Sequence, residues 1–289
     1  MRNRFGIHGP VHDWSASYIS GRSQIVTVNS QFSLPASSVC GVPQGSVFGP
    51  FEFIIYSEDL VSMTDNVPAI LPHFCADDIQ SSSHDDVTAV CRVLEQCVHD
   101  VQIWCYSRRL QLNPAKTELI WFGSQVNLEH LVTADVSVRV GQTVVQSSDR
   151  VRDLGVILDS SLSMRQHIAK VTSTYFFHLR RFRKIGKVLD QDRRNCLACA
   201  FILTRIDYCN TLFAGLPDAT LAPLQRVGLL HAAARFVGGP STSRSRNASV
   251  MALHWLPVRQ RITYKLCCLM RGVVCGHAPE YLVDMVVPV

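Results

Sequence analysis

Two neighbouring carboxylates, Asp77 and Asp78, are the residues of this sequence best suited to metal chemistry. An apolar segment precedes them and the polar residues 80–84 follow, so we expect two short strands with the carboxylates at the bend. Like charges this close disfavour joint ionisation, and a divalent cation removes the conflict. Two Mg²⁺ ions about 4 Å apart can activate a hydroxyl and stabilise a leaving oxygen. Taken alone, an Asp-Asp pair is more often a solvated turn, and at this point both interpretations stay open.

A loop punctuated by glycine and proline lies upstream of the aspartates. It runs Gly41-Val42-Pro43-Gln44-Gly45-Ser46 and leads into the apolar residues 47–60, for which we expect a buried helix after Pro50. Glycine lets a backbone approach a phosphate or a base closely, and a helix N-terminus favours an anion. The loop therefore suits a phosphate-bearing ligand.

The patterns around these residues predict an α+β protein in two parts. Apolar positions three or four apart indicate a helix over residues 86–106, and residues 12–18 indicate a shorter one. Strands are expected over residues 24–28, 117–122, 138–145 and 151–158. Beyond residue 160 the pattern is helical to the end. We therefore expect one domain over residues 1–159 and an all-helical one over residues 160–289.

The composition is that of a core-forming globular protein, with 47% hydrophobic and 18% charged residues. No stretch approaches the roughly 18 apolar residues of a membrane span, and the first residues lack the apolar run of a secretory signal. We expect a protein that is not secreted and works inside the cell, in nucleus or cytoplasm. Its cysteines, such as Cys97, Cys105, Cys267 and Cys268, lie in apolar segments, which favours reduced core thiols over disulfides.

Charge is distributed unevenly along the chain. Residues 1–160 hold 10 Lys+Arg against 17 Asp+Glu, a net charge of −7, whereas residues 161–289 hold 18 against 6, a net charge of +12. A basic half of this size can neutralise phosphates over a broad surface. A polyanion is the partner that this asymmetry favours.

Cations concentrate among aromatic residues within residues 167–187. A helix there can lay its cationic side along a nucleic-acid backbone, or it can be an ordinary solvated face over a packed core. The residues that would make backbone contact are Lys170, Arg180, Arg181, Arg183 and Lys184, and from the residues alone both interpretations stay open.

The order of several motifs resembles that of reverse transcriptases from non-LTR (LINE-type) retrotransposons, and the resemblance covers nearly the whole chain. It rests on the loop Gly41–Pro50, on Asp77-Asp78 after an apolar strand, and on Leu112–Glu118 (LNPAKTE), Leu154–Asp159 (LGVILD), Arg205–Asn210 (RIDYCN), Ala214–Pro217 (AGLP) and His254–Pro257 (HWLP).

The resemblance implies a polymerase palm up to residue 159, a helical thumb with a C-terminal region, and templated DNA synthesis with two Mg²⁺ ions. The implied thumb position favours nucleic-acid backbone contact for the cations within residues 167–187. An RNA template, a DNA primer and deoxynucleoside triphosphates are the implied partners. Asp77 would be the main metal ligand, with Asp78 beside it. The remaining implied roles are contact with nucleotide and template by Gln44, Gly45 and Ser46, a position near the triphosphate for Lys116, and a primer-grip hairpin at Leu154 and Gly155. For Lys116 a solvated loop lysine is the equally weighted alternative.

Two departures from the family pattern stand out. Cys75 occupies a position before the aspartates that usually holds an aromatic residue. The family also needs an aspartate on an earlier palm strand, and this sequence starts just downstream of the place expected for that strand. Asp13 lies in a predicted helix and is not a substitute. We therefore expect no polymerase activity from this chain alone. The alternatives are a non-enzymatic nucleic-acid-binding protein derived from such an element, or a relic without a selected role.

Overall fold

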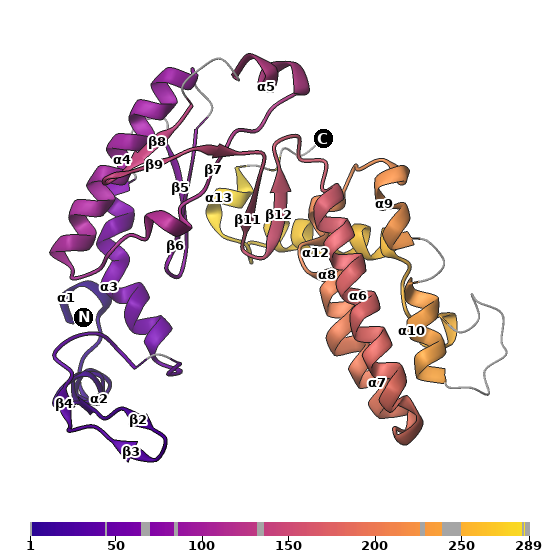
Figure 1. The fold of residues 1–289 in the computed structure, drawn as a ribbon, viewed down its shortest axis with the longest axis horizontal. Helices are drawn as coiled ribbons and strands as arrows, with labels where there is room; N and C mark the ends of the chain where they lie inside the picture. Colours follow the sequence, from indigo (N-terminus) through magenta and orange to yellow (C-terminus); the bar gives the residue numbers. More distant parts are fainter. Residues whose placement is uncertain are drawn as a thin grey trace. The chain divides into compact units, whose positions relative to one another are not determined.

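The computed structural model describes residues 2–43, 45–64, 70–83, 86–131, 136–225, 229–238, 250–284 and 286. The backbone forms two compact units. Unit 1 comprises Met1–Thr117 with Val136–Gln146, and unit 2 comprises Glu118–Asp135 with Ser147–Val289 (Figure 1). Short strands in the N-terminal half and a mostly helical C-terminal half confirm the α+β class. The expected limit at residue 159 falls inside unit 2, and as the end of a palm it stays a prediction.

The helices of unit 1 follow the apolar patterns of the sequence. They are α1 (Arg2–Phe5), α2 (Pro10–Ile19), α3 (Gly49–Thr64) and α4 (Val87–Ser107), followed by the 3-10 turn η1 (Pro114–Lys116). In α4, Val90, Cys97, Val101 and Cys105 form one buried face, which confirms the helix expected there. The Asp86 carboxylate accepts from the backbone N–H groups of Thr88 and Ala89 at 3.2 and 3.3 Å and so caps its start.

The helix expected after Pro50 is present as α3, but the expectation that it is buried was wrong. Its side chains Phe51, Ile54 and Tyr56 are exposed, whereas Leu60 lies in a core that α4 and strand β5 (Leu71–Cys75) also line. The buried residues of α3, among them Glu52, Leu60 and Thr64, gather on one side of the helix. An apolar run identifies the helix but not the number of its faces that find a partner.

Strands in unit 1 are shorter and more numerous than the sequence predicts. The single strand expected over residues 24–28 is two strands, β1 (Ser23–Gln24) and β2 (Thr27–Val28), which pair with β4 (Ala36–Ser37) and β3 (Gln31–Phe32). The strand expected over residues 138–145 is a hairpin of β8 (Val138–Val140) and β9 (Thr143–Val145). Gly141, with φ of 60°, makes its turn. Apolar runs on both sides of a tight turn therefore resemble one strand.

The small strands of unit 2 lie within residues 119–159. β7 (Leu119–Ile120), much shorter than the strand expected over residues 117–122, pairs in parallel with β10 (Ser147–Ser148), and helix α5 (Gln125–Leu131) follows β7. Residues 151–158, expected as one strand, form a hairpin of β11 (Arg150–Asp153) and β12 (Val156–Asp159). Leu154 and Gly155 at its turn have φ of 42° and 88°, the double left-handed geometry of a two-residue turn.

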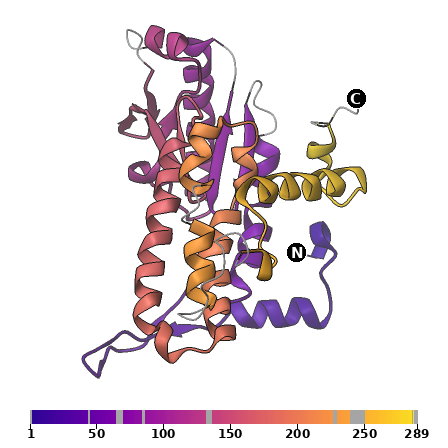
Figure 2. The same ribbon diagram turned by 90° about the vertical axis from the view of Figure 1, so that its right-hand side faces the viewer.

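Most helices of unit 2 contribute to one core, built around α6. Figures 1 and 2 show α10 lying against α6 and α7. Tyr175 and Leu179 of α6 are fully buried, and the Tyr175 hydroxyl donates to the Leu229 carbonyl. The helical segments are α6 (Arg165–Ile185), η2 (Gly186–Val188), α7 (Gln191–Ala198), the π-helical η3 (Cys199–Leu203), α8 (Thr204–Asp207), η4 (Asn210–Phe213), α9 (Asp218–Gln225), α10 (Leu229–Gly238), α12 (Val258–Val274) and α13 (Glu280–Val283).

The cysteines are free thiols, but only some of them lie in the core. Cys97 and Cys105 are buried as expected, whereas Cys267 and Cys268 are exposed on α12, where the expectation of core positions was wrong. In the described part of the chain no helix combines the length and the apolarity that a membrane crossing needs.

Asp159 joins the β11–β12 hairpin to helix α6. Its buried carboxylate, 8% exposed, accepts from the backbone N–H groups of Ser163 and Met164 at 2.8 and 3.0 Å and from the hydroxyls of Ser161 and Ser163 at 2.8 and 3.1 Å. Burial by itself raises the pKa of this carboxyl, but the hydrogen bonds outweigh burial, so the pKa lies below its ordinary value. The charged carboxylate therefore holds the chain in place where α6 begins.

Replacing Asp159 by Ala should lower the free energy of unfolding by about 2 kcal/mol, because two buried backbone N–H groups lose a charged acceptor. The contribution is complete above the ordinary carboxyl pKa and is lost as the pH falls through the lower folded value. Urea unfolding at pH 7 measures it. Asp149→Ala, at an exposed position, is the matched control. Equal effects of both substitutions would contradict the role of Asp159.

Candidate active site and nucleic-acid interface

The two aspartates lie where a tight hairpin turns. Strand β5 pairs antiparallel with β6 (Asp78–Ser82), and Cys75 stands opposite Asp78. The turn is Ala76-Asp77, and Ala76 has φ of 55°, in the left-handed region that few residues with a Cβ adopt. Both aspartates are exposed. The expectation of two strands with carboxylates at the bend is confirmed, and the metal-binding role stays a prediction.

The hairpin is fixed to unit 1 through one of its faces. Phe74 and Ile79, opposite each other in the register, pack against a core of α3 and α4 that includes Leu60 and Val101. In Figure 1, α3 and β5 run in opposite directions, so the turn lies toward the end of unit 1 at which α3 begins. The reach between the carboxylates and the glycine-rich loop before α3 stays a prediction.

Hydrogen bonds shape the glycine-rich loop from both ends. The Arg22 guanidinium donates to the Gly41 carbonyl, and the Ser46 hydroxyl accepts from the Gly49 N–H at 2.9 Å, next to the first turn of α3. Gly45 has φ of 80°, a conformation that favours glycine. A Cβ on Gly49 would lie 2.8 Å from the Ser46 hydroxyl oxygen, so Gly49 is also required for this cap. Gln44 lies outside the described residues.

Helix α2 anchors the same loop from the side. The Trp14 ring lies edge-on to Phe48 at 4.9 Å between centroids, and Tyr18 meets Phe48 at 5.7 Å. The Ser15 hydroxyl donates to the Glu52 carboxylate, and both side chains are buried. A buried polar pair of this kind holds two helices in one register, because neither group can be exposed alone without losing its partner.

Lys116 lies in η1 at an exposed position, after α4. The Asn113 side chain accepts from the Ala115 N–H at 3.1 Å and holds this turn. Within the described ranges no hydrogen bond or ion pair joins Lys116 to Asp77 or Asp78. The role of this lysine near a triphosphate stays a prediction.

The donor set at the hairpin turn is two exposed carboxylates, which are oxygen ligands of the kind that Mg²⁺ takes. Among the described residues, no group of three or more His, Cys, Asp or Glu side chains is placed to hold a metal ion. Cys75 is exposed and lies opposite Asp78 in the hairpin. The family that the sequence resembles usually has an aromatic residue at this position. The turn can therefore offer two charges and little apolar cover to a cation.

In unit 2, the Leu154–Gly155 turn is tied to the helices at two points. The Tyr208 hydroxyl donates to the Leu154 carbonyl at 2.5 Å, and the Ile157 N–H donates to Nδ1 of His167 in α6 at 3.3 Å. The hairpin expected at this motif is present, and its function as a primer grip stays a prediction. Tyr208 and His167 were not identified from the sequence, although Tyr208 belongs to the Arg205–Asn210 motif.

The predicted cationic residues all lie on α6 and are exposed. An α-helix turns by about 100° per residue, which places four of them in an arc of roughly 100° opposite the buried Ile168, Tyr175 and Leu179. The Arg181 guanidinium lies 5.5 Å from the centre of the Phe177 ring on the same face. The four are Lys170, Arg180, Arg181 and Lys184, and Arg183 lies at the side of the arc.

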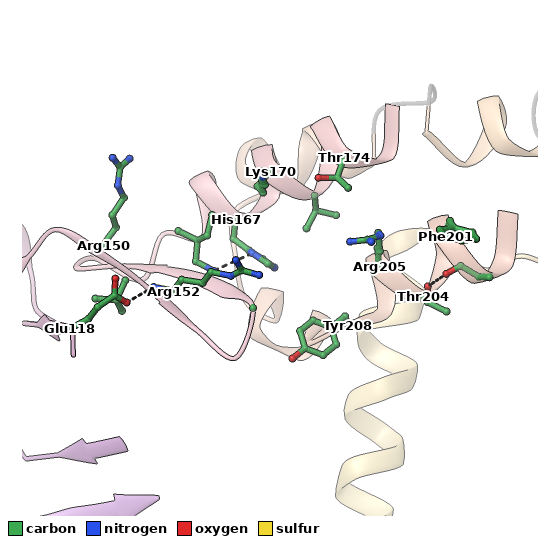
Figure 3. Close-up of a pocket in the computed structure, with 15 residues that line it drawn as sticks. Glu118, Arg150, Arg152, His167, Lys170, Thr174, Phe201, Thr204, Arg205 and Tyr208 are labelled. Carbon is green, nitrogen blue, oxygen red and sulfur yellow. Dashed lines mark hydrogen bonds between the residues drawn. The ribbon is translucent and has the colours of Figure 1, made fainter. Parts of the chain in front are cut away.

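Unit 2 also contains a basic pocket of about 800 Å³. Its walls come from the β11–β12 hairpin, from α6 and from the η3–α8 segment (Figure 3). Four cationic side chains line it, and only Lys170 among them was singled out from the sequence. The others are Arg150, Arg152 and Arg205. Arg150 and Arg152 are two residues apart on β11, whereas Lys170 and Arg205 lie far from them along the chain. Only the folded structure therefore reveals the four as a group.

His167 is a buried, neutral part of this pocket wall. Its side chain is 5% exposed, and burial lowers its pKa. Because Nδ1 accepts from the Ile157 N–H, the ring proton is on Nε2 in the neutral form. Protonation of Nδ1 would break that hydrogen bond. His167 therefore couples the hairpin to α6 only while it is uncharged.

A hairpin bearing two aspartates, a glycine-rich loop before a helix, and a basic helical unit together describe a nucleic-acid polymerase module. The chain belongs to the reverse transcriptase (RNA-dependent DNA polymerase) family, whose model matches residues 2–158, more than half of its length. It is distantly related to the RNA-directed DNA polymerases of non-LTR retrotransposons.

Three relatives illustrate this distance, all from Drosophila melanogaster. The probable RNA-directed DNA polymerase from transposon BS is 25% identical over 179 residues, 60% of this chain and 19% of that protein. The RNA-directed DNA polymerase from mobile element jockey is 20% identical over 80% of this chain and 25% of its own length. The probable polymerase from transposon X-element is 26% identical over 54% and 17%. The chain thus spans a quarter or less of these relatives. No solved structure matches it.

Acidification should destabilise the chain through His167. Folding lowers the pKa of His167, so the unfolded chain takes up the proton first as the pH falls. The contribution of neutral His167 to the free energy of unfolding is therefore complete above about pH 6.5 and decreases below that value. We expect the urea midpoint to fall between pH 7.5 and 5.5, and to fall less in His167→Gln. The pKa of His178 is also lowered by burial, so part of the decrease will remain. His99→Gln, at an exposed position of α4, is the control. A decrease as large in His167→Gln as in the unchanged chain would overturn this assignment.

Proposed function

We propose that this chain carries the metal-binding hairpin, the nucleotide loop and the thumb of an RNA-directed DNA polymerase from a non-LTR retrotransposon. The observation that carries the proposal is the exposed Asp77-Asp78 pair at the β5–β6 turn, in a chain of the reverse transcriptase family. Adjacent carboxylates on a strand turn anchored by a packed face suit hard cations.

In this proposal Asp77 and Asp78 would hold Mg²⁺, which would supply charge stabilisation. The reaction is nucleotidyl transfer: the primer 3′-hydroxyl attacks the α-phosphate of a deoxynucleoside triphosphate, and pyrophosphate leaves. The loop at Gly45 and Ser46 lies against the nucleotide and template, since its backbone is open and leads into the N-terminus of α3. Lys116 lies near the triphosphate. The carbonyls and amides of the Leu154–Gly155 turn position the primer end.

The nucleic acid is held by unit 2 in this proposal. The exposed cations of α6 contact phosphates of an RNA template and DNA primer, while the opposite side of α6 is packed in the core. Phosphate contacts fix position without reading sequence, so little sequence preference is expected.

A second function, nucleic-acid binding without catalysis, is supported by the separation of the two sets of residues. The aspartates belong to unit 1, and the cations of α6 belong to unit 2 with its own core. Binding by unit 2 therefore needs no intact metal site. Substitution of Asp77 separates the two functions, because it affects synthesis and leaves binding unchanged.

The 289-residue chain, given Mg²⁺, a primed RNA template and deoxynucleoside triphosphates, should show no templated DNA synthesis. Two Mg²⁺ ions bring a charge of +4, and the two carboxylates supply −2. A version extended with a family segment that carries the further aspartate strand should gain synthesis, and Asp77→Ala should then lower its rate at least about 100-fold, because metal stabilisation is worth several kcal/mol. Primer extension measures both. Synthesis by the short chain that Asp77→Ala abolishes would contradict the predicted inactivity. Synthesis by the extended chain that is insensitive to Asp77→Ala would contradict the metal assignment.

Replacing Arg180, Arg181 and Arg183 together by Ala should weaken binding to a primed template and flatten its salt dependence. Each lost phosphate contact reduces the slope of log affinity against log salt by about 0.7 to 0.9. Fluorescence anisotropy over a range of salt concentrations measures it, and Ala preserves the helix. Arg92→Ala, at an exposed position of α4, is the control. Unchanged binding in the triple variant would remove the thumb assignment.

A further inference from the structure

The basic pocket of unit 2 brings together cations from three different elements. Arg152 comes from β11, Lys170 from α6 and Arg205 from α8. Figure 3 shows Arg152 and Arg205 on opposite sides of one space, with His167 and Lys170 along its upper wall. The convergence is a property of the fold, since Arg205 lies far along the chain from the other two.

Little inside the protein neutralises these charges. The one carboxylate of the wall, Glu118, accepts from the backbone N–H of Arg152 at 3.1 Å. Across the described ranges no carboxylate forms an ion pair with the side chains of Arg152, Lys170 or Arg205. With Arg150, which donates to Gln166 at 3.0 Å, four cations face one carboxylate, a net charge of +3. Holding like charges together costs free energy that a bound anion would recover.

A neighbouring histidine senses the same positive potential. Burial lowers the pKa of His178 on α6, and the positive charges of Arg205 and Arg181 lower it further. His178 therefore lies close to Arg205, and the excess of cations over carboxylates among the lining residues makes the pocket electropositive.

The walls of the pocket are held in place before any ligand arrives. Tyr208 ties the α8 segment to the Leu154 carbonyl, and Asp207, between Arg205 and Tyr208, pairs with Arg261 of α12 at 2.6 Å. The Arg261 side chain is 13% exposed, so this ion pair is partly shielded from solvent. Preorganised walls reduce the entropy lost on binding.

We propose that this pocket binds a phosphate group of a single-stranded nucleic-acid strand through Arg152, Lys170 and Arg205. Two guanidinium groups offer forked donors that match phosphate oxygens, and a net charge of +3 favours phosphate over a singly charged carboxylate. The volume of about 800 Å³ accommodates a nucleotide unit, and the Phe201 side chain on the wall is 39% exposed, so it can contact a base. The proposal rests on the nucleic-acid-binding function above and adds a site distinct from the outer face of α6, with Lys170 shared.

The test uses the full 289-residue chain and three probes: inorganic phosphate, a short single-stranded oligonucleotide, and its uncharged methylphosphonate analogue. Backbone amide resonances of Arg152, Gly155 and Arg205 report on the pocket by NMR. Phosphate should shift them, and Arg152→Gln with Arg205→Gln should weaken phosphate binding at least about tenfold, the loss of about one charged hydrogen bond. Arg92→Gln with Arg139→Gln, at exposed positions of unit 1, is the matched control and should leave phosphate binding unchanged. The charged oligonucleotide should displace phosphate, and the neutral analogue should not.

Three results would overturn the proposal. Resonances of the pocket that do not move with phosphate or oligonucleotide would remove the site, and this measurement does not depend on how the variants fold. Equal weakening by the control pair would show general attraction to a basic surface. Phosphate binding that the oligonucleotide does not displace would assign the pocket to free phosphate. Loss of primed-template binding only in the α6 triple variant would leave the proposed function intact while the pocket fails, so the two failures are distinguishable.

Discussion

Both candidate sites depend on one constraint. The fold brings side chains of like charge close together, with few opposite charges beside them in the described part of the chain. The Ala76-Asp77 turn sets two carboxylates side by side on an exposed hairpin, and the fold of unit 2 gathers Arg152, Lys170 and Arg205 around one pocket. Each arrangement brings like charges together, and a ligand of opposite charge would relieve their repulsion. A cation for the first site and a polyanion for the second are the ligands of a polymerase, which agrees with the family to which the chain belongs.

Packing within each unit offsets the repulsion between the like charges of its site. In unit 1 the Phe74–Ile79 face of the hairpin contributes to a core with α3 and α4, while the opposite side stays open. In unit 2 the buried side of α6 packs against the other helices, and its cationic side faces solvent. Burial of apolar area, at about 25 cal/mol per Å², is the general source of free energy that lets a fold hold groups which repel one another.

Periodicity predicted the long elements well and the short ones poorly. The helix expected over residues 86–106 is α4 within one residue at each end, because many apolar side chains at one spacing agree on one face. The strand expected over residues 151–158 is a hairpin, because Leu154 and Gly155 adopt left-handed φ values that a list of apolar residues does not encode. Phe51 and Ile54 are exposed although they are apolar. An apolar residue favours burial, but the sequence does not show whether another element will pack against it.

The sequence by itself determined the family, the hairpin with carboxylates at its bend, and the basic character of the C-terminal half, because these follow from adjacent residues and from composition. Only the tertiary structure decided that Tyr208 holds the Leu154–Gly155 turn, that Asp159 fastens the hairpin to α6, and that the cations of the pocket converge. The physical reason is range. Local motifs act through neighbours along the chain, whereas a pocket is made by side chains that meet only after separate elements have packed together.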